Sequence, residues 1–363
     1  MTVVKQAIYV GTYTRRGDDQ THRSESIYIC EFDSASGELK LRDVISNVPN
    51  PSFLAISQDQ RRLFAVNEEA TFNGAPGGGV SAFALDSTPI ARINAEPTQG
   101  ASPCYITLDA AEKWVLVANY TGGNLTVLPV FDDGRLGKAA FVHQNQGYSI
   151  NAERQGSAHA HCAIFDPAGR YVLAADLGMD QVQVYGFDAA NGHLLPHSMV
   201  TVEPGAGPRH LEFHPNGRIL YVINELNFSI GVYDYDADQG TLAHKQTVIV
   251  LPADIEGARW GADIHINRAG SFLYASNRGY DCIAVFSVHP HDGTLAHIET
   301  VPSGGSMPRS FALDLTEGYL LVAHQDSHSL IIFEIDRQTG RLAQTGKTLS
   351  IPYPVCVKVK PLQ

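Results

Sequence analysis

The stretch PRHLEFHPNGRILYVINEL, Pro208–Leu226, contains two short apolar runs joined by the turn sequence HPNGR. Proline followed by Asn-Gly favours a tight turn between antiparallel strands, and the runs show no helical periodicity. The stretch therefore predicts a β-hairpin. An Arg-His pair begins its first strand, and an Asn-Glu pair ends its second strand.

The same hairpin pattern recurs along the chain. Equivalent stretches begin at Pro51, Ser102, Ala160, Pro208, Gly261 and Pro308. The residues that end the second run are 47 to 57 positions apart: Asn67, Asn119, Asp176, Asn224, Asn277 and His324. A third run rich in β-branched and aromatic residues follows each hairpin, and in every unit except the one that begins at Pro51 a polar G-x-L turn then precedes a weaker fourth run. Each unit therefore predicts four strands.

Four-stranded units that repeat at about 40 to 50 residues are typical of a β-propeller. The N-terminal AIYVGTYT and SIYICEFDSASGEL supply the second to fourth strands of one more unit, and the C-terminal YPVCVKVK supplies its first strand. We therefore expect an all-β, seven-bladed β-propeller with four antiparallel strands per blade. It should form a single domain over residues 1–363, and both chain ends should close one shared blade.

The composition limits the possible partners. Apolar residues make up 44% of the 363 residues, and the formal net charge is −12, which argues against nucleic acid or an anionic membrane as a partner. The five cysteines are far apart without C-x-x-C spacing, and we find neither a spanning apolar segment nor a signal peptide. We expect a compact cytoplasmic protein, a monomer or weak homo-oligomer, in which an anionic ligand meets a locally basic pocket.

Polar residues are expected to gather at one end of the blades. In an antiparallel hairpin the start of one strand and the end of the next lie together, so Arg209-His210 and Asn224-Glu225 should converge. The first strand of a propeller blade is innermost, so every blade should deliver its equivalents to one channel mouth. The expected set is Asn67, Glu68, Asn119, Tyr120, His159, His161, Asp176, Arg209, His210, Asn224, Glu225, Asp263, His265, Asn277, Arg278, Arg309, His324 and Gln325.

Several of these residues also have structural interpretations. An Asn or Asp at a strand end often bonds its own backbone. Three arginines, Arg209, Arg278 and Arg309, would repel each other at one mouth unless an anion or carboxylates compensated, which favours a functional role for them. Glu225 is either the neutralising partner of an arginine or a catalytic group.

His159-Ala160-His161 places two imidazoles on the same side of a strand. Metal ligation, general acid or base catalysis and a structural role all remain open for this pair.

The chain resembles the lactonase family of seven-bladed propellers, which includes the cycloisomerase-2 type of 6-phosphogluconolactonase and the fungal carboxymuconate lactonizing enzyme. The resemblance covers essentially the whole chain, through motifs such as YVGTYT, VANYTGGNLTV, NAERQGSAHAH, GAGPRHLEFHPNG, YVINEL and ASNRGYDCIAVF. It implies a catalytic site of His161, Arg209, Glu225 and Arg278. Asp176 and His324 depart from the Asn found at their position in the other repeats.

Together these inferences predict hydrolysis of a small anionic lactone, 6-phospho-D-glucono-1,5-lactone, without metal or other cofactor. Glu225 or His161 would activate water, Arg209 would stabilise the oxyanion, and the phosphate would contact Arg278 and Arg309. The expected substrate-binding residues are His159, Asn119, Asn224, His265, Asn277 and Arg309.

Three other functions stay open. A metal-dependent sugar lactonase would use the oxygen ligands Glu68, Asn119, Asp176, Asn224 and Glu225. A lactonizing enzyme would close a carboxylated muconate. A non-enzymatic propeller would serve as a scaffold for protein interactions.

Overall fold

The computed structural model describes residues 5–14, 23–251 and 259–362, and in these ranges it contains strands and turns without a helix. The strands form seven four-stranded sheets and one two-stranded hairpin, β6 (Thr71–Phe72) with β7 (Ala75–Pro76). Within the described part of the chain, no helix could span a membrane. The chain divides into two compact units: Ser52–Thr247, and the segments up to Pro51 and from Val248.

The four sheets that begin within Ser52–Thr247 each follow chain order from their first strand to their last. The first contains β4 (Leu54–Ile56), β5 (Arg62–Asn67), β8 (Gly79–Ala84) and β9 (Ala91–Pro97). The second contains β10 (Pro103–Leu108), β11 (Trp114–Asn119), β12 (Asn124–Pro129) and β13 (Phe141–Gln144). The third contains β14 (Ala160–Phe165), β15 (Tyr171–Asp176), β16 (Gln181–Asp188) and β17 (His193–Thr201). The fourth contains β18 (Pro208–Phe213), β19 (Ile219–Asn224), β20 (Ser229–Asp236) and β21 (Thr241–Ile249).

The other unit contains three sheets. Two follow chain order. The first of these contains β22 (Trp260–Ile266), β23 (Phe272–Arg278), β24 (Cys282–Val288) and β25 (Leu295–Pro302). The second contains β26 (Pro308–Leu313), β27 (Tyr319–His324), β28 (Ser329–Ile335) and β29 (Leu342–Ser350). The third contains β1 (Lys5–Thr12), β2 (Ser26–Asp33), β3 (Glu38–Ser46) and β30 (Pro354–Pro361).

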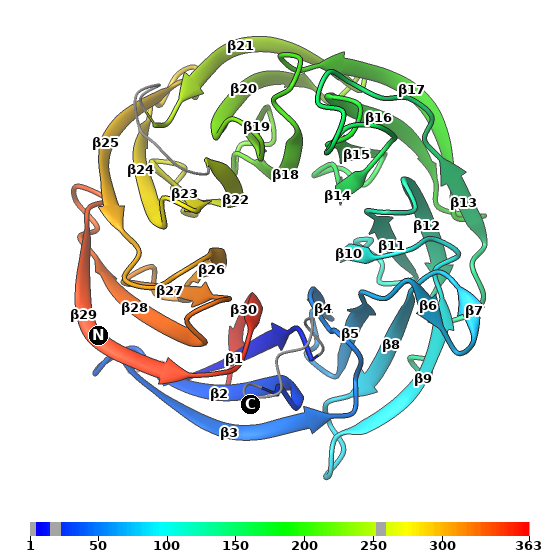
Figure 1. The fold of residues 1–363 in the computed structure, drawn as a ribbon, viewed down its shortest axis with the longest axis horizontal. Helices are drawn as coiled ribbons and strands as arrows, with labels where there is room; N and C mark the ends of the chain where they lie inside the picture. The colour runs from blue at the N-terminus through cyan, green and yellow to red at the C-terminus, as the bar shows by residue number, and fades with distance from the viewer. Residues whose placement is uncertain (1–4, 15–22, 252–258, 363) are drawn as a thin grey trace. The chain divides into compact units, whose positions relative to one another are not determined.

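The two ends of the chain share this last sheet. Figure 1 shows β30 beside β1, and the two strands pair antiparallel from Gln6 with Pro361 to Thr12 with Pro354. β30 therefore occupies the position that the first strand holds in the other sheets. The predicted sharing of one sheet by the two chain ends is confirmed, and so is the prediction of seven four-stranded antiparallel sheets.

The core lies between neighbouring sheets. In the Ser52–Thr247 unit, Leu173 and Val184 of one sheet join Leu220, Val222 and other residues of the next in one buried cluster. The second strands are buried along nearly their whole length, and successive side chains point to opposite faces, so both faces of an inner sheet pack against an apolar neighbour. Packing of this kind fixes the hairpin ends relative to each other within the unit. The prediction of a single domain over residues 1–363 stays a prediction.

A β-bulge recurs near the start of the first strand of several sheets. The strand register shifts between Pro103 and Tyr105, between Ala160 and Cys162, and between Pro208 and His210. The bulged residues are therefore Cys104, His161 and Arg209, which occupy the same position in three consecutive sheets. A bulge bends the strand and redirects the side chain of the extra residue. The shared bulge therefore sets the direction of the Cys104, His161 and Arg209 side chains.

Candidate active site

Arg209 and Glu225 meet at the open end of the β18–β19 hairpin. Pro208 pairs with Asn224, so the next residue of β18 and the residue after β19 lie at the same edge. Arg209 Nε donates to Glu225 Oε2 at 3.0 Å, and only 2% of the Arg209 side chain and 4% of the Glu225 side chain are exposed. The expected convergence of the two residues is confirmed. A buried carboxylate is stable in this position because it is paired and hydrogen-bonded.

Glu225 also accepts from a second arginine. Arg154 Nη2 lies 2.5 Å from Glu225 Oε1 and 3.2 Å from the phenol oxygen of Tyr120. Burial opposes the charge of Arg154, but the attraction of Glu225 and the bonds to Tyr120 and Glu225 outweigh it, so the Arg154 pKa is raised above its ordinary value. Burial is also the main reason that the pKa of Tyr120 is raised. One carboxylate is thus shared by two permanently charged arginines.

His161 lies beside this carboxylate. Its Nε2 is 3.8 Å from Glu225 Oε2, which is beyond hydrogen-bond distance, and its side chain is buried. On the other side of the ring, Nδ1 lies 3.8 Å from the sulfur of Cys104, and the thiol donates to the main-chain oxygen of His161 at 3.4 Å. Cys104 and His161 are equivalent bulge residues of adjacent sheets, which explains why their side chains meet.

Aromatic rings surround His161 and His210. Arg209 Nη1 lies 3.0 Å from His210 Nε2, and since a guanidinium only donates, that nitrogen of His210 is the acceptor. The His161 and His210 rings pack edge to face at a centroid distance of 5.4 Å, and the Tyr105 ring lies 5.3 Å from that of His210. These contacts fix the orientation of both imidazoles.

His159, predicted to bind substrate, lies on the other side of Tyr120. The two rings stack at 4.6 Å, and His159 Nδ1 lies 2.9 Å from the main-chain oxygen of Tyr120. His161 packs edge to face on the same phenol ring at 5.4 Å. The structure therefore brings His159 and His161 to one aromatic side chain, and the part of His159 in substrate binding stays a prediction.

Asn119 and Asn224 bond within their own sheets. Asn119 Nδ2 donates to Asn124 Oδ1 at 2.7 Å and to Thr126 Oγ1 at 3.0 Å, and Asn224 Nδ2 donates to Ser229 Oγ at 2.8 Å. Both side chains are buried. These bonds join the end of the second strand to the third strand, and contact with substrate stays a prediction for both residues.

The remaining predicted site residues belong to the other unit. Arg278 Nη2 donates to the main-chain oxygen of Gly261 at 3.1 Å. His265 Nε2 lies 3.4 Å from an oxygen of Asp263. Arg309 stacks over the ring of Tyr13 at 5.5 Å, and Asn277 accepts from the backbone of Tyr280 at 3.1 Å. The catalytic role of Arg278 and the substrate contacts of His265, Asn277 and Arg309 stay predictions.

Asp176 and His324, which replace the Asn found at this position in the other repeats, have different environments. Asp176 is buried and accepts from Asn145 Nδ2 and the backbone of His159, while burial raises its pKa. His324 is buried, its two ring nitrogens have no hydrogen-bond partner among the described residues, and burial lowers its pKa to about 4. His324 faces Ser329 across the β27–β28 pair, and the next residue on that face is the apolar Ile331, where the second sheet has Thr126.

Metal ligation was one interpretation of the His159–His161 pair. Outside the stretches 1–4, 15–22, 252–258 and 363, no three His, Cys, Asp or Glu side chains are grouped so as to hold a metal ion. The His161 ring lies between Cys104 and Glu225.

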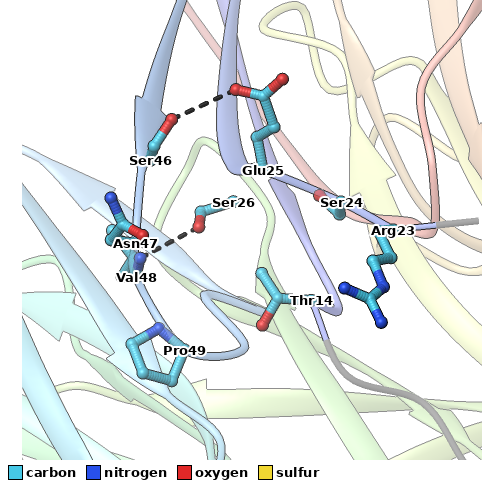
Figure 2. Close-up of a pocket in the computed structure, with 9 residues that line it drawn as sticks. All are labelled: Thr14, Arg23, Ser24, Glu25, Ser26, Ser46, Asn47, Val48 and Pro49. Carbon is cyan, nitrogen blue, oxygen red and sulfur yellow. Dashed lines mark hydrogen bonds between the residues drawn. The ribbon is translucent and has the colours of Figure 1, made fainter. Parts of the chain in front are cut away.

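A polar pocket of about 650 Å³ occurs elsewhere, in the unit that contains both chain ends. Figure 2 shows its lining around Thr14, Glu25 and Asn47, with Ser46 donating to Glu25 at 3.2 Å. None of the predicted site residues lines it. We therefore place the candidate site at the Glu225 cluster, which contains Glu225, Arg209, Arg154, His161 and Tyr120.

The profile of the family described as "Lactonase, 7-bladed beta-propeller" matches residues 7–359. The chain belongs to this family. The prediction of a seven-bladed β-propeller and the resemblance to the lactonase family are thereby confirmed.

The chain is also similar to individual lactonase relatives. It is 37% identical to a 6-phosphogluconolactonase of Bacillus subtilis over 352 residues, which cover 96% of this chain and 97% of the relative. It is 32% identical over 358 residues to a 6-phosphogluconolactonase of Formosa agariphila, with 95% and 96% coverage. Among solved structures, the periplasmic gluconolactonase of Pseudomonas aeruginosa superposes with a TM-score of 0.90 at 32% identity, over 98% of this chain and 99% of that one.

The sequence analysis did not identify two residues that contact the candidate site, Arg154 and Cys104. Arg154 lies in a loop before the third sheet, outside the repeating strands, so the spacing of the repeats could not predict where its side chain lies. Cys104 occupies the same repeat position as His161 and Arg209, and that equivalence was the signal that could have identified it. The partner of a loop residue depends on the conformation of the loop, which the sequence pattern does not give.

Proposed function

We propose that this chain is a lactone hydrolase whose substrate is 6-phospho-D-glucono-1,5-lactone and whose product is 6-phosphogluconate. Membership of the lactonase family and the two 6-phosphogluconolactonases among its relatives support this assignment. The observation that carries it is the buried Glu225 carboxylate shared by Arg209 and Arg154, with His161 Nε2 3.8 Å away. Ester hydrolysis is accelerated by a base that activates water and by positive charge that stabilises the oxyanion.

His161 is the general base in this proposal. Both oxygens of Glu225 accept hydrogen bonds from arginines, and such bonds favour the charged carboxylate and make it a poor acceptor of a proton. The thiol of Cys104 donates to a main-chain oxygen, which leaves its sulfur to accept from Nδ1–H of His161. In this tautomer Nε2 is the ring nitrogen without a proton, and we assign it as the atom that accepts the proton of water. A positioned base of this kind contributes about 10²–10⁴-fold to the rate.

The reaction balances with this set of residues. A water oxygen attacks the lactone carbonyl carbon while its proton passes to His161 Nε2. The tetrahedral intermediate collapses, the bond between the carbonyl carbon and the ring oxygen breaks, and the proton is returned to that ring oxygen. The product is a hydroxy acid that ionises in water. Glu225 stabilises the transient imidazolium electrostatically, and the positive charge of Arg209 favours the oxyanion.

Arg278 and Arg309 keep their proposed roles of contacting the anionic group of the substrate. We propose that Arg278→Ala raises the KM for the phosphorylated lactone far more than for the unphosphorylated one. Equal effects on the two lactones would remove this assignment.

We also propose that the protein is cytoplasmic. All five cysteines are buried and free of disulfides, as expected in a reducing compartment. Cell fractionation of the native host with an antibody against this chain tests this. Recovery outside the cytoplasmic fraction would overturn it.

A lactone panel tests the function directly. The wild-type protein is assayed on 6-phosphogluconolactone, glucono-1,5-lactone and a muconolactone, with and without EDTA, after subtraction of spontaneous hydrolysis. We expect the highest kcat/KM with the phosphorylated lactone and no loss with EDTA. A rate that disappears with EDTA and returns with a divalent metal would favour the metal-dependent lactonase instead.

A further inference from the structure

Arg154 presents unused hydrogen-bond donors beside the candidate site. Its two hydrogen bonds, to Glu225 and to Tyr120, both use Nη2. The Nε–H and Nη1–H donors have no acceptor among the residues that the structure describes. About 34% of the Arg154 side chain is exposed, against 4% for Glu225. Arg154 therefore carries donors on the solvent side of a buried carboxylate. Adjacent N–H groups of a guanidinium suit the two oxygens of a phosphate or carboxylate.

Arg154 shares its carboxylate partner with a second arginine. Glu225 is its one carboxylate partner in the described part of the chain, and Arg209 binds the same carboxylate. Two permanently charged arginines thus contact the same carboxylate, in a chain whose formal net charge is −12. Such an arrangement attracts an anion because the buried surroundings screen charge poorly.

Tyr120 adds a neutral donor at the same place. Its phenol oxygen accepts from Arg154 at 3.2 Å, and its own hydrogen has no acceptor within the described ranges. Burial raises the pKa of this phenol, so the hydrogen stays on the oxygen at neutral pH. An anion seated against Arg154 can accept this hydrogen as well.

The loop that carries Arg154 is held in place by Gln155. The Gln155 side chain is buried, its Nε2 donates to the Leu177 main-chain oxygen at 2.9 Å, and its Oε1 accepts from the Asn151 backbone at 3.1 Å. The Arg154 backbone donates to Asn151 Oδ1 at 3.1 Å. The loop is therefore preorganised, and binding an anion at Arg154 requires little ordering of the backbone.

We propose that Arg154 and Tyr120 form an anion subsite that binds the phosphate group of the lactone substrate. This inference rests on the proposed function for its substrate. It assigns the phosphate to residues of the Glu225 cluster, whatever Arg278 and Arg309 contribute. Arg154 has a second effect in this arrangement, since its contact with Glu225 links substrate binding to the catalytic carboxylate.

The test compares KM values for two lactones in matched variants. Arg154→Ala is expected to raise the KM for 6-phosphogluconolactone tenfold or more, and to change the KM for glucono-1,5-lactone less than threefold. Arg154→Lys should recover part of the loss, and Tyr120→Phe should give a smaller shift in the same direction. Arg135→Ala, which removes an exposed arginine paired with Asp133, is the control and should leave both values unchanged. Equal losses on both lactones would overturn the subsite and leave Arg154 as a support for Glu225.

Direct binding separates failure of this inference from failure of the proposed function. Inorganic phosphate is titrated into the wild type, Arg154→Ala and Arg135→Ala by calorimetry, with thermal unfolding as the check on folding. We expect the Kd to rise at least tenfold in Arg154→Ala alone. If the wild type hydrolyses neither lactone but phosphate binding depends on Arg154, the proposed function is wrong and the anion subsite is supported. Phosphate binding that is absent, or the same in all three proteins, overturns the subsite.

Discussion

At the scale of single residues, Glu225 connects the groups of the candidate site. It pairs with Arg209 within its own hairpin, with Arg154 from a loop, and lies 3.8 Å from His161. Removal of one partner from a buried ion pair leaves an uncompensated charge, so each of these side chains depends on the others. In the proposed mechanism the two arginines pair with the carboxylate and His161 accepts the proton.

Chemical rescue distinguishes the roles of His161 and Glu225. His161→Ala should lower kcat by about 10²–10⁴-fold because the general base is missing. Added imidazole should restore part of this rate in His161→Ala and should not restore the rate in Glu225→Ala. The measurement is the lactone hydrolysis rate at increasing imidazole concentration, corrected for the same concentrations without protein. Rescue of Glu225→Ala alone would identify Glu225 as the base.

His324 should make stability depend on pH. Burial lowers its pKa to about 4, whereas an unfolded chain has a value of about 6.5. The unfolded state therefore binds more protons between these values, and the free energy of unfolding falls as the pH decreases from 6.5 towards 4, by about 3 kcal/mol from this group. Above pH 6.5 this contribution is fully present.

His324→Asn, which restores the residue of the neighbouring repeats, tests this dependence. Urea unfolding at pH 7 and pH 4.5 should show a smaller loss of stability on acidification in the variant than in the wild type. The same loss in both proteins would show that His324 does not carry the effect.

At the scale of elements, the same turn closes several hairpins. Asp166 accepts from the backbones of Arg170 and Tyr171 at 2.7 and 2.8 Å, and Asp109 and Asp314 make the equivalent bonds. A carboxylate at the start of a turn satisfies backbone donors that the sheet cannot reach. Asp166 also accepts from Tyr235 at 3.2 Å, which ties the turn to the neighbouring sheet.

Asp166→Ala should therefore lower the free energy of unfolding by about 1–3 kcal/mol, because partly buried backbone donors lose a charged acceptor. KM values for both lactones should stay unchanged, since the turn lies at the opposite end of the strands from Arg209 and Glu225. Asp238→Ala, an exposed aspartate, is the control. Denaturant unfolding and the lactone assay measure both effects. A change in KM without loss of stability would contradict this structural role.

The hairpins could be predicted from the sequence because apolar runs, Pro/Gly turns and a regular spacing all agree on them. Convergence of Arg209 and Glu225 followed from strand pairing alone. The bulge at Cys104, His161 and Arg209 could not be predicted, since it depends on packing against the next sheet rather than on a local propensity. Arg154 was missed for a similar reason, because loop geometry carries it to Glu225.

Over the length of the whole chain, the pairing of its two ends completes one four-stranded sheet. β30 pairs with β1 along its length, and Val357 packs in one buried cluster with Ile8, Val10 and Leu321. Without β30, β1 would be an exposed sheet edge. The pairing of the two chain ends could be predicted from the sequence because the N-terminal unit has no segment that matches a first strand, and the C-terminal segment does match one.

Truncation after Tyr353 should therefore remove more stability than any single substitution proposed above. We expect the truncated chain to lose cooperative thermal unfolding and to aggregate. Adding a peptide of residues 354–361 should restore cooperative unfolding, because it can pair with β1. A truncated chain that unfolds at the wild-type temperature would contradict closure by β30.

The most direct test of the central claim is the hydrolysis rate of 6-phosphogluconolactone by Glu225→Gln, which keeps the side-chain shape and removes the charge. We expect the wild-type protein to hydrolyse this lactone well above the spontaneous rate. The variant should lose about 100-fold or more in kcat/KM while remaining folded, a loss of about 2.7 kcal/mol in transition-state stabilisation. A variant that hydrolyses this lactone at the wild-type rate would contradict the claim that the shared carboxylate forms the active site.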